Sequence, residues 1–206
     1  CMRFPKNEDG TIDEVEAERM LDHAIESGVT YIDTAYPYHD GESEPFVGRV
    51  LKKYKREDFY LATKLPMFKI NSLEQAKEIF EEQMKRLDVN YVDFYLLHAL
   101  NKDTWKKVMD LNIIPYCEEL KKQGRIKNFG FSFHDDYEVF EEIINYRDWD
   151  FCQIQLNYID TDIQAGMKGY KLTEEKNVPL VIMEPIKGGA LASLSDDIEQ
   201  VFKSEL

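Results

Sequence analysis

The segment from residue 28 to residue 38 decides the fold, because it joins an apolar, strand-like run to a polar end. It reads Gly28-Val29-Thr30-Tyr31-Ile32-Asp33-Thr34-Ala35-Tyr36-Pro37-Tyr38, with a predicted strand over Thr30–Thr34. Five later runs repeat the pattern, nearly apolar along their length and polar or charged where they finish: Phe59–Lys64, Val92–His98, Ile126–Phe131, Phe151–Leu156 and Leu180–Met183. A spacing of about 25–35 residues is typical of repeated βα units with parallel strands. Runs with little polar alternation suit strands covered on both faces.

Amphipathic segments separate these runs and predict helices. Asp13–Ser27 has apolar residues close to a 3.6 period, and Ser72–Leu87 opens on an N-cap serine with Gln75 three residues later. The other predicted helices are Trp105–Lys122, Asp135–Tyr146 and Asp196–Ser204. Strands alternating with helices favour either an open doubly wound sheet or a (β/α)8 TIM barrel.

The length of 206 residues is short for a complete barrel, which usually needs about 250. With Cys1–Phe4 taken as the tail of a first strand, seven strands are expected, and about one βα unit would lie beyond Leu206. The chain starts with Cys1 rather than Met, and no low-complexity linker divides it. We therefore expect residues 1–206 to be one α/β barrel domain, incomplete at both ends.

Composition excludes several classes of protein. A net charge of −14 argues against a nucleic-acid binder, which needs a basic face. No apolar run approaches a membrane span of roughly 18 residues. The three cysteines, Cys1, Cys117 and Cys152, lie far apart without a CxxC motif, so neither a disulfide framework nor a metal site within this chain is expected. A reducing, cytoplasmic location fits this pattern, and the oligomeric state stays open.

In barrels and open α/β sheets the chemistry lies beyond the carboxyl ends of the strands. Four residues there predict an acid-catalysis site at a carbonyl. A free tyrosine such as Tyr38 has a pKa of roughly 10, and a nearby ammonium such as Lys64 would lower it. Asp33 can partner that buried ammonium, and His98 can donate a hydrogen bond to a carbonyl oxygen and orient it. A site of this kind needs a hydride donor.

The motifs that carry these residues resemble the aldo-keto reductase family. The resemblance rests on the order of six segments within a match from about Cys1 to Ala192: Gly28–Ala35 with Tyr38 five residues after Asp33, Gly41–Leu51, Ala62–Lys64, Asp93–His98, Ile126–Ser132 and Ile154–Tyr158. It implies a (β/α)8 barrel with NADP(H) or NAD(H) extended across its C-terminal face, and a nicotinamide that reduces an aldehyde or ketone, the small-molecule substrate.

The resemblance also implies roles for individual residues. Tyr38 would be the general acid, Lys64 and Asp33 would tune it, and His98 would orient the carbonyl. Two residues, Ser132 and Gln155, would hold the carboxamide of the cofactor. Segment 183–189 would lie along the nicotinamide and the pyrophosphate, with the cofactor-binding residues Met183, Pro185, Ile186 and Gly188.

Departures from the family pattern and two alternatives accompany this interpretation. Many members have Ser-Asn where this chain has Ser132-Phe133, and many stack an aromatic residue where Met183 or Glu184 stands. The stretch Glu184–Gly189 is most like a branch with a cysteine-rich ferredoxin-like tail, whose 4Fe–4S clusters would lie beyond Leu206. The first alternative is a non-catalytic regulatory subunit that binds the nicotinamide cofactor. The second, a metal-dependent hydrolase, is disfavoured because the four histidines are isolated.

Overall fold

Six parallel strands form a single sheet in the order β1-β2-β3-β4-β5-β6. The computed structural model describes residues 1–193, 198–200 and 203. The strands within these residues are β1 Tyr31–Asp33, β2 Tyr60–Leu65, β3 Val92–Leu100, β4 Ile126–Phe133, β5 Phe151–Gln155 and β6 Leu180–Met183. Each of the six predicted strand runs is thereby confirmed, with boundaries shifted by at most two residues at either end.

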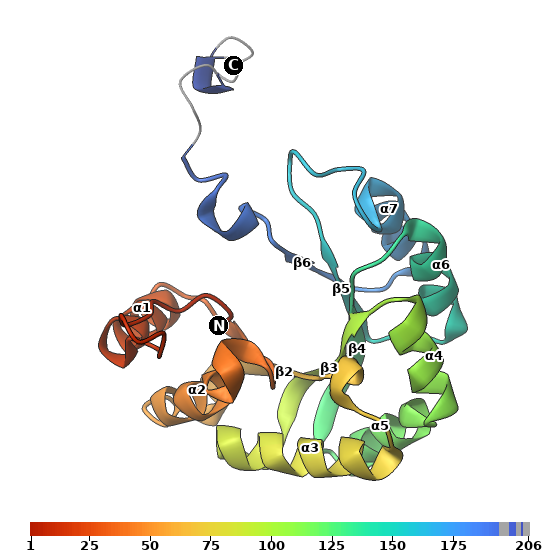
Figure 1. Ribbon diagram of the computed structural model, residues 1–206, viewed down its shortest axis with the longest axis horizontal. Coiled ribbons are helices and arrows are strands. Elements are labelled where there is room, and N and C mark those ends of the chain that lie inside the picture. Colours follow the sequence, from red (N-terminus) through yellow and green to blue (C-terminus); the bar gives the residue numbers. More distant parts are fainter. Residues whose placement is uncertain (194–197, 201–202, 204–206) are drawn as a thin grey trace.

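The sheet curls into an arc with the helices on its outer side (Figure 1). A doubly wound sheet reverses its strand order at a switch point, whereas here every strand pairs with the next one along the chain. Successive parallel strands joined by outer helices are the path of a (β/α)8 barrel. The expectation of an incomplete barrel is confirmed.

Seven α-helices occur within residues 1–193: α1 Glu14–Glu26, α2 Ser43–Leu51, α3 Leu73–Leu87, α4 Lys102–Asp110, α5 Ile113–Lys122, α6 Tyr137–Tyr146 and α7 Gly166–Lys176. Two N-caps agree with the sequence. Asp13 accepts from the Glu16 amide at 3.1 Å, and Ser72 accepts from the Gln75 amide at 3.2 Å. Short 3₁₀ turns cover Tyr38–Gly41, Arg56–Asp58, Met67–Lys69 and Lys187–Gly189.

The prediction of one helix over Trp105–Lys122 is wrong, because the chain breaks into α4 and α5. Asn112 takes a left-handed conformation with φ 56° between them, which asparagine tolerates better than most residues. Helices α2 and α7 were not predicted. Most of the expected helix Asp196–Ser204 lies outside the described residues.

Cys1–Phe4 is not the tail of a strand, so the described residues hold six strands rather than seven. A strand needs a ladder of hydrogen bonds to a neighbour. Here the terminal ammonium of Cys1 donates to the Asp33 carbonyl, while the Phe4 amide donates to the His39 ring. Phe4 itself is buried against Phe46. None of the described helices is both long and apolar enough to cross a bilayer.

A small apolar cluster separate from the main core forms a floor inside the arc. Ala62, Leu96 and Phe151 are its buried members, and Tyr31, Phe94 and Val181 pack against them. Side chains two residues apart in a strand share a face. Two residues further along β1, β2, β3 and β5 stand Asp33, Lys64, His98 and Gln153. The fold therefore places a polar layer directly above the apolar one.

Candidate active site

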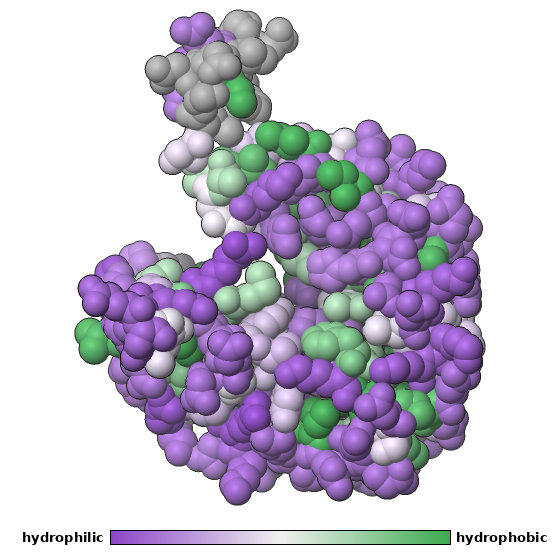
Figure 2. Space-filling view, in the orientation of Figure 1, coloured by the Kyte–Doolittle hydropathy of each residue, from purple (hydrophilic) through white to green (hydrophobic). Residues whose placement is uncertain are grey.

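A cavity of about 500 Å³ lies above this floor, at the carboxyl ends of the strands. This volume falls within the usual range of small-molecule sites, roughly 300–1,000 Å³. Figure 2 shows the molecule hollowed between the part that carries α1 and α2 and the segment after β6. The cavity brings together all the predicted site residues except Gln155: Asp33, Tyr38, Lys64, His98, Ser132, Met183, Pro185, Ile186 and Gly188.

Lys64 is the most deeply buried charge in this layer, with 1% of its side chain exposed. Its ammonium donates to the Asp33 carboxylate at 2.5 Å and to the Thr34 carbonyl at 2.8 Å. Burial lowers the pKa of Lys64, but the negative charge of Asp33 and the nearby Tyr38 outweigh it, so the pKa lies above its ordinary value. Lys64 is consequently a fixed cation inside the cavity at neutral pH.

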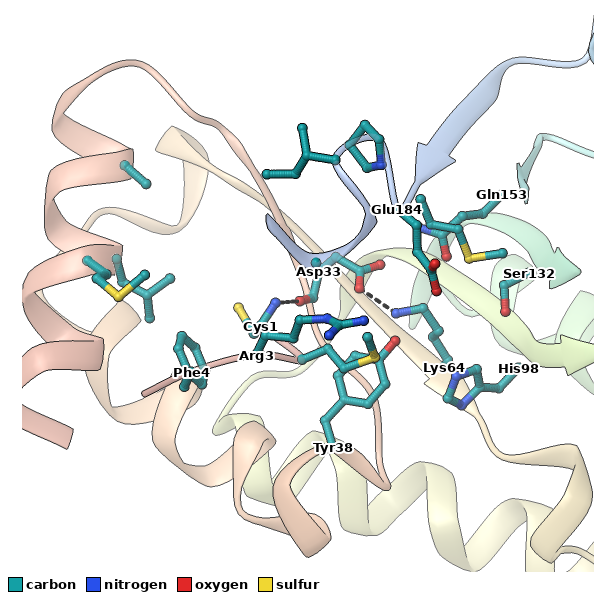
Figure 3. Close-up of a pocket in the computed structure, with 18 of the residues that line it drawn as sticks. Cys1, Arg3, Phe4, Asp33, Tyr38, Lys64, His98, Ser132, Gln153 and Glu184 are labelled. Atoms are coloured by element: carbon teal, nitrogen blue, oxygen red, sulfur yellow. Dashed lines mark hydrogen bonds and ion pairs between the residues drawn. The ribbon is translucent and has the colours of Figure 1, made fainter. Parts of the chain in front are cut away.

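Tyr38 follows β1 and points its ring into the cavity next to Lys64 (Figure 3). The Lys64 ammonium lies 4.8 Å from the centre of the Tyr38 ring. Lys64 lowers the pKa of Tyr38, as the sequence predicts, but burial raises it by more, and Asp33 adds to the rise. The net pKa is above that of free tyrosine, so Tyr38 holds its proton at neutral pH.

His98 completes the group from β3, with its ring 5.7 Å from that of Tyr38 in an edge-on arrangement. Phe68 packs on His98 at 5.6 Å between ring centres. Burial, with the positive charge of Lys64 and the neighbouring His134, lowers the pKa of His98 to about 3. The imidazole is therefore neutral, and its buried Nδ1 has no hydrogen-bond partner among the described residues. A neutral imidazole can donate a hydrogen bond to an incoming oxygen without delivering a charge.

Ser132 and the segment after β6 also line the cavity. The Ser132 hydroxyl accepts from the Ala99 amide at 2.8 Å and still has its own proton to donate. Gly188 has a φ of 68°, and a Cβ there would lie 2.6 Å from the Arg3 guanidinium carbon. Gly188 therefore lets the Arg3 side chain lie directly against this turn.

Gln155 does not line the cavity; Gln153, two residues earlier on the same face of β5, does. The Gln155 oxygen accepts from Gln164 at 3.0 Å, and its amide nitrogen lies 3.5 Å from Asp160. No hydrogen bond engages the Gln153 side chain within the described part of the chain. Side chains two residues apart in a strand point to the same face, so the sequence pattern could not tell which glutamine lines the cavity. The contacts of Gln155 with Gln164 and Asp160 make the difference.

Four further charged or titratable residues line the cavity without having been predicted as site residues: Cys1, Arg3, His134 and Glu184. Glu184 has a left-handed backbone with φ 56° directly after β6. Burial lowers the pKa of His134, while the Glu184 carboxylate opposes the change. The position of His134 and Glu184 just past strand ends is the signal that could have found them.

The residues present fit a nicotinamide carboxamide, which needs both a hydrogen-bond donor and an acceptor. The free hydroxyl proton of Ser132 and the unengaged amide of Gln153 supply both inside the cavity. For metal ions the result is different. In the residues that the structure describes, no group of three or more His, Cys, Asp or Glu side chains is placed to hold one.

Comparison with known proteins gives one consistent result. A sequence model described as "Aldo/keto reductase family" matches residues 2–206. The NADH-specific methylglyoxal reductase of Escherichia coli (strain K12) is 25% identical over 186 residues, which is 80% of this chain and 54% of that protein. The chain thus spans about half the length of this curated relative.

Solved structures agree. The aldo-keto reductase AKR11C1 from Bacillus halodurans, in its holo form, superposes with a TM-score of 0.65 at 30% identity, covering 82% of this chain and 57% of that one. The thermostable aldo-keto reductase Tm1743, in complex with the inhibitor epalrestat, gives a TM-score of 0.73 at 26% identity. That match covers 95% of this chain and 69% of the Tm1743 chain.

Proposed function

The chain belongs to the aldo/keto reductase family, and from this premise we propose an NAD(P)-dependent oxidoreductase that reduces an aldehyde or ketone, with Tyr38 as general acid. The observation that carries the proposal is the convergence of Tyr38 and His98 on one cavity with the buried Lys64–Asp33 pair. The substrate would be a small carbonyl compound, and methylglyoxal, acted on by the E. coli relative, is a first one to assay.

A reduced nicotinamide, when bound, supplies the hydride. The protein must supply the proton and hold the carbonyl. The Tyr38 hydroxyl donates its proton to the carbonyl oxygen as negative charge develops there. The Lys64 ammonium stabilises the phenolate that Tyr38 becomes, and Asp33 keeps that ammonium charged in a buried position.

His98 holds the carbonyl oxygen in place. Because burial lowers the pKa of His98 to about 3, it acts as a neutral donor, and the proton must come from Tyr38. Ser132 and Gln153 hold the carboxamide of the nicotinamide, and Gln153 replaces Gln155 in this role. Either NADPH or NADH is the donor; the relative specific for NADH makes NADH the first to assay.

We also propose how many domains the chain forms, where in the cell it works and which partners it lacks. Residues 1–206 would form a single barrel domain, and free Cys117 and Cys152, both buried, fit a reducing cytoplasm. A net charge of −14 disfavours nucleic acid as a partner.

Steady oxidation of NADPH or NADH with a panel of aldehydes tests the function. We expect turnover by the wild-type protein and a loss of roughly 10²–10⁴-fold in Tyr38→Phe, with cofactor affinity nearly unchanged. Tight cofactor binding without turnover, identical in wild type and Tyr38→Phe, would instead support the regulatory subunit.

A further inference from the structure

A side chain of α3 binds the peptide carbonyl of Lys64 at the point where β1 leaves the sheet. The last backbone hydrogen bond between β1 and β2 runs from the Thr34 amide to the Ala62 carbonyl at 2.9 Å. In a parallel pair, alternate residues of one strand face the neighbour. The Lys64 carbonyl faces the same side two residues later, and there the Gln83 amide nitrogen donates to it at 3.0 Å. Gln83 therefore replaces a backbone donor that β1 no longer provides.

The surroundings of Gln83 determine which end of its amide meets Lys64. Its nitrogen also lies 2.8 Å from Glu44 Oε1 and 3.0 Å from the Thr63 hydroxyl oxygen. Its oxygen accepts from the Tyr95 phenol at 2.8 Å. A carboxylate only accepts hydrogen bonds, so Glu44 requires the nitrogen on its side. With the amide reversed, its oxygen would face both the carboxylate and the Lys64 carbonyl.

Glu44 is itself unusual, because it is a fully buried acid outside the cavity. Its side chain has 0% exposure, and its Oε2 has no hydrogen-bond partner within the described residues. The nearest cation is Arg86, 3.6 Å away. Burial raises the pKa of Glu44, while hydrogen bonds from Thr63 and Gln83 and the positive charge of Arg86 oppose the rise. A buried ion pair offsets the cost of desolvation only when its geometry is excellent. The 3.6 Å separation from Arg86 is long for such a pair, so fold stability alone does not explain Glu44.

We propose that Glu44 and Gln83 are positioning residues that fix the end of β2 and so align the Lys64 ammonium with Tyr38. The chain of contacts runs from the Glu44 carboxylate through the Gln83 amide to the Lys64 peptide, and from there through the Lys64 side chain to the cavity. The inference rests on the proposed function, since it gives these two residues a part in preparing the acid Tyr38.

The first test is Gln83→Met, which keeps the shape of the side chain and removes its hydrogen bonds. A Lys64 that is free to shift stabilises the Tyr38 phenolate less well. We therefore expect kcat to fall roughly 10- to 100-fold, the range that small misplacements in active sites produce. The alkaline limb of the kcat profile should move to higher pH, because Tyr38 would keep its proton longer. An alkaline limb that stays in place overturns the proposal.

A swapped pair separates positioning from structural support. Glu44→Gln combined with Gln83→Glu keeps one buried carboxylate, one amide and the acceptor for Tyr95, but residue 83 can no longer donate to the Lys64 carbonyl. We expect the melting temperature to recover relative to either single variant while kcat and the alkaline limb do not. Recovery of all three means that only the buried pair matters, which also overturns the proposal. Either variant decides the question if the other does not fold.

Two controls complete the design. Thr173→Val removes a buried hydroxyl on α7, which donates to the Tyr170 carbonyl at 2.6 Å far from Lys64 in the sequence. It should lower the melting temperature and leave the pH profile unchanged. Tyr38→Phe tests the premise: if its turnover equals that of wild type, the proposed function fails. If Tyr38→Phe is inactive while Gln83→Met retains the wild-type profile, only the positioning role fails.

Discussion

The ammonium of Lys64 lies 2.5 Å from the carboxylate of Asp33, and the two differ sharply in their access to water. Lys64 has 1% of its side chain exposed and Asp33 has 23%. The cation is thus enclosed, whereas its counter-ion lines the cavity with part of its side chain exposed. The Asp33 Oδ2 atom is itself buried and has no hydrogen-bond partner in the described chain. Asp33 therefore holds the charge of Lys64 from one side, while the same ammonium lies 4.8 Å from the centre of the Tyr38 ring.

Lys64→Met removes the ammonium and keeps the length of the side chain. Because the phenolate of Tyr38 then has no cation beside it, we expect kcat to fall roughly 10²–10⁴-fold. The alkaline limb of the pH profile should also move upward, since Lys64 lowers the pKa of Tyr38. Stopped-flow measurement of nicotinamide absorbance, extended to above about pH 10, where free tyrosine titrates, checks both. A variant with wild-type turnover would remove Lys64 from the mechanism.

His98→Gln tests whether the histidine is buried in its neutral form. Its folded pKa of about 3 lies below the ordinary 6.5, so the unfolded chain takes up the proton first. The contribution of neutral His98 to the free energy of unfolding is therefore fully present above pH 6.5. It is lost as the pH falls toward 3, by up to about 1.4 kcal/mol per pH unit. Between pH 7 and pH 5, urea titrations should show wild type losing about 2 kcal/mol more than His98→Gln.

The matched control for this prediction is His23→Gln, on an exposed part of α1. Its stability should follow wild type across the same pH range. Equal pH dependence in wild type and His98→Gln would mean that His98 is solvated or paired when the protein is folded, contrary to the unpartnered Nδ1.

The strand pattern was predictable because burial on both faces leaves a strong compositional signal. In β3, for example, Val92, Tyr95 and Leu97 pack under the helices, and Phe94 and Leu96 pack on the floor of the arc. The strand ends, and with them the placement of Tyr38, Lys64 and His98 in one cavity, followed from the parallel topology. The catalytic roles of these residues stay predictions.

Other features depended on contacts that no local pattern encodes. The break at Asn112 needs a left-handed residue inside an otherwise helical sequence. The start of α7 contains Gly166 and Gly169, which have low helix propensity and which the packing nevertheless requires. A Cβ on Gly169 would lie 2.6 Å from the Ala165 Cβ. Gln153 and Gln155 have the same residue type and the same orientation in β5. Only the tertiary contacts of Gln155 show that Gln153 is the one that lines the cavity.

Gln153→Leu and Gln155→Leu test that separation directly. Gln153 has an unengaged amide in the cavity, so its loss should weaken NADPH or NADH binding roughly 10-fold, the effect of one hydrogen bond of about 1.4 kcal/mol. Gln155 binds Gln164 and lies near Asp160, so its loss should lower stability and leave cofactor affinity within about threefold. Titration by nucleotide fluorescence measures the affinity. The reverse order would restore Gln155 as the carboxamide residue.

Gly130→Ala tests whether the floor of the arc sets the packing below the site. Gly130 lies in β4 beside Phe151, and an added Cβ would lie 2.4 Å from the Phe151 carbonyl oxygen and 2.7 Å from its ring. A backbone oxygen cannot rotate away, so β4 and β5 must separate locally. We expect a loss of about 1–3 kcal/mol in the free energy of unfolding, typical of overpacked cores. Ser132 and Gln153 stand two residues further along these strands and pair in register, so cofactor affinity should fall as well.

Lys127→Ala, at an exposed position of β4, is the control and should change neither the free energy of unfolding nor the cofactor affinity measurably. Urea denaturation gives the stability and fluorescence titration the affinity; a Gly130→Ala protein as stable as wild type would show that the two strands have room that these distances deny.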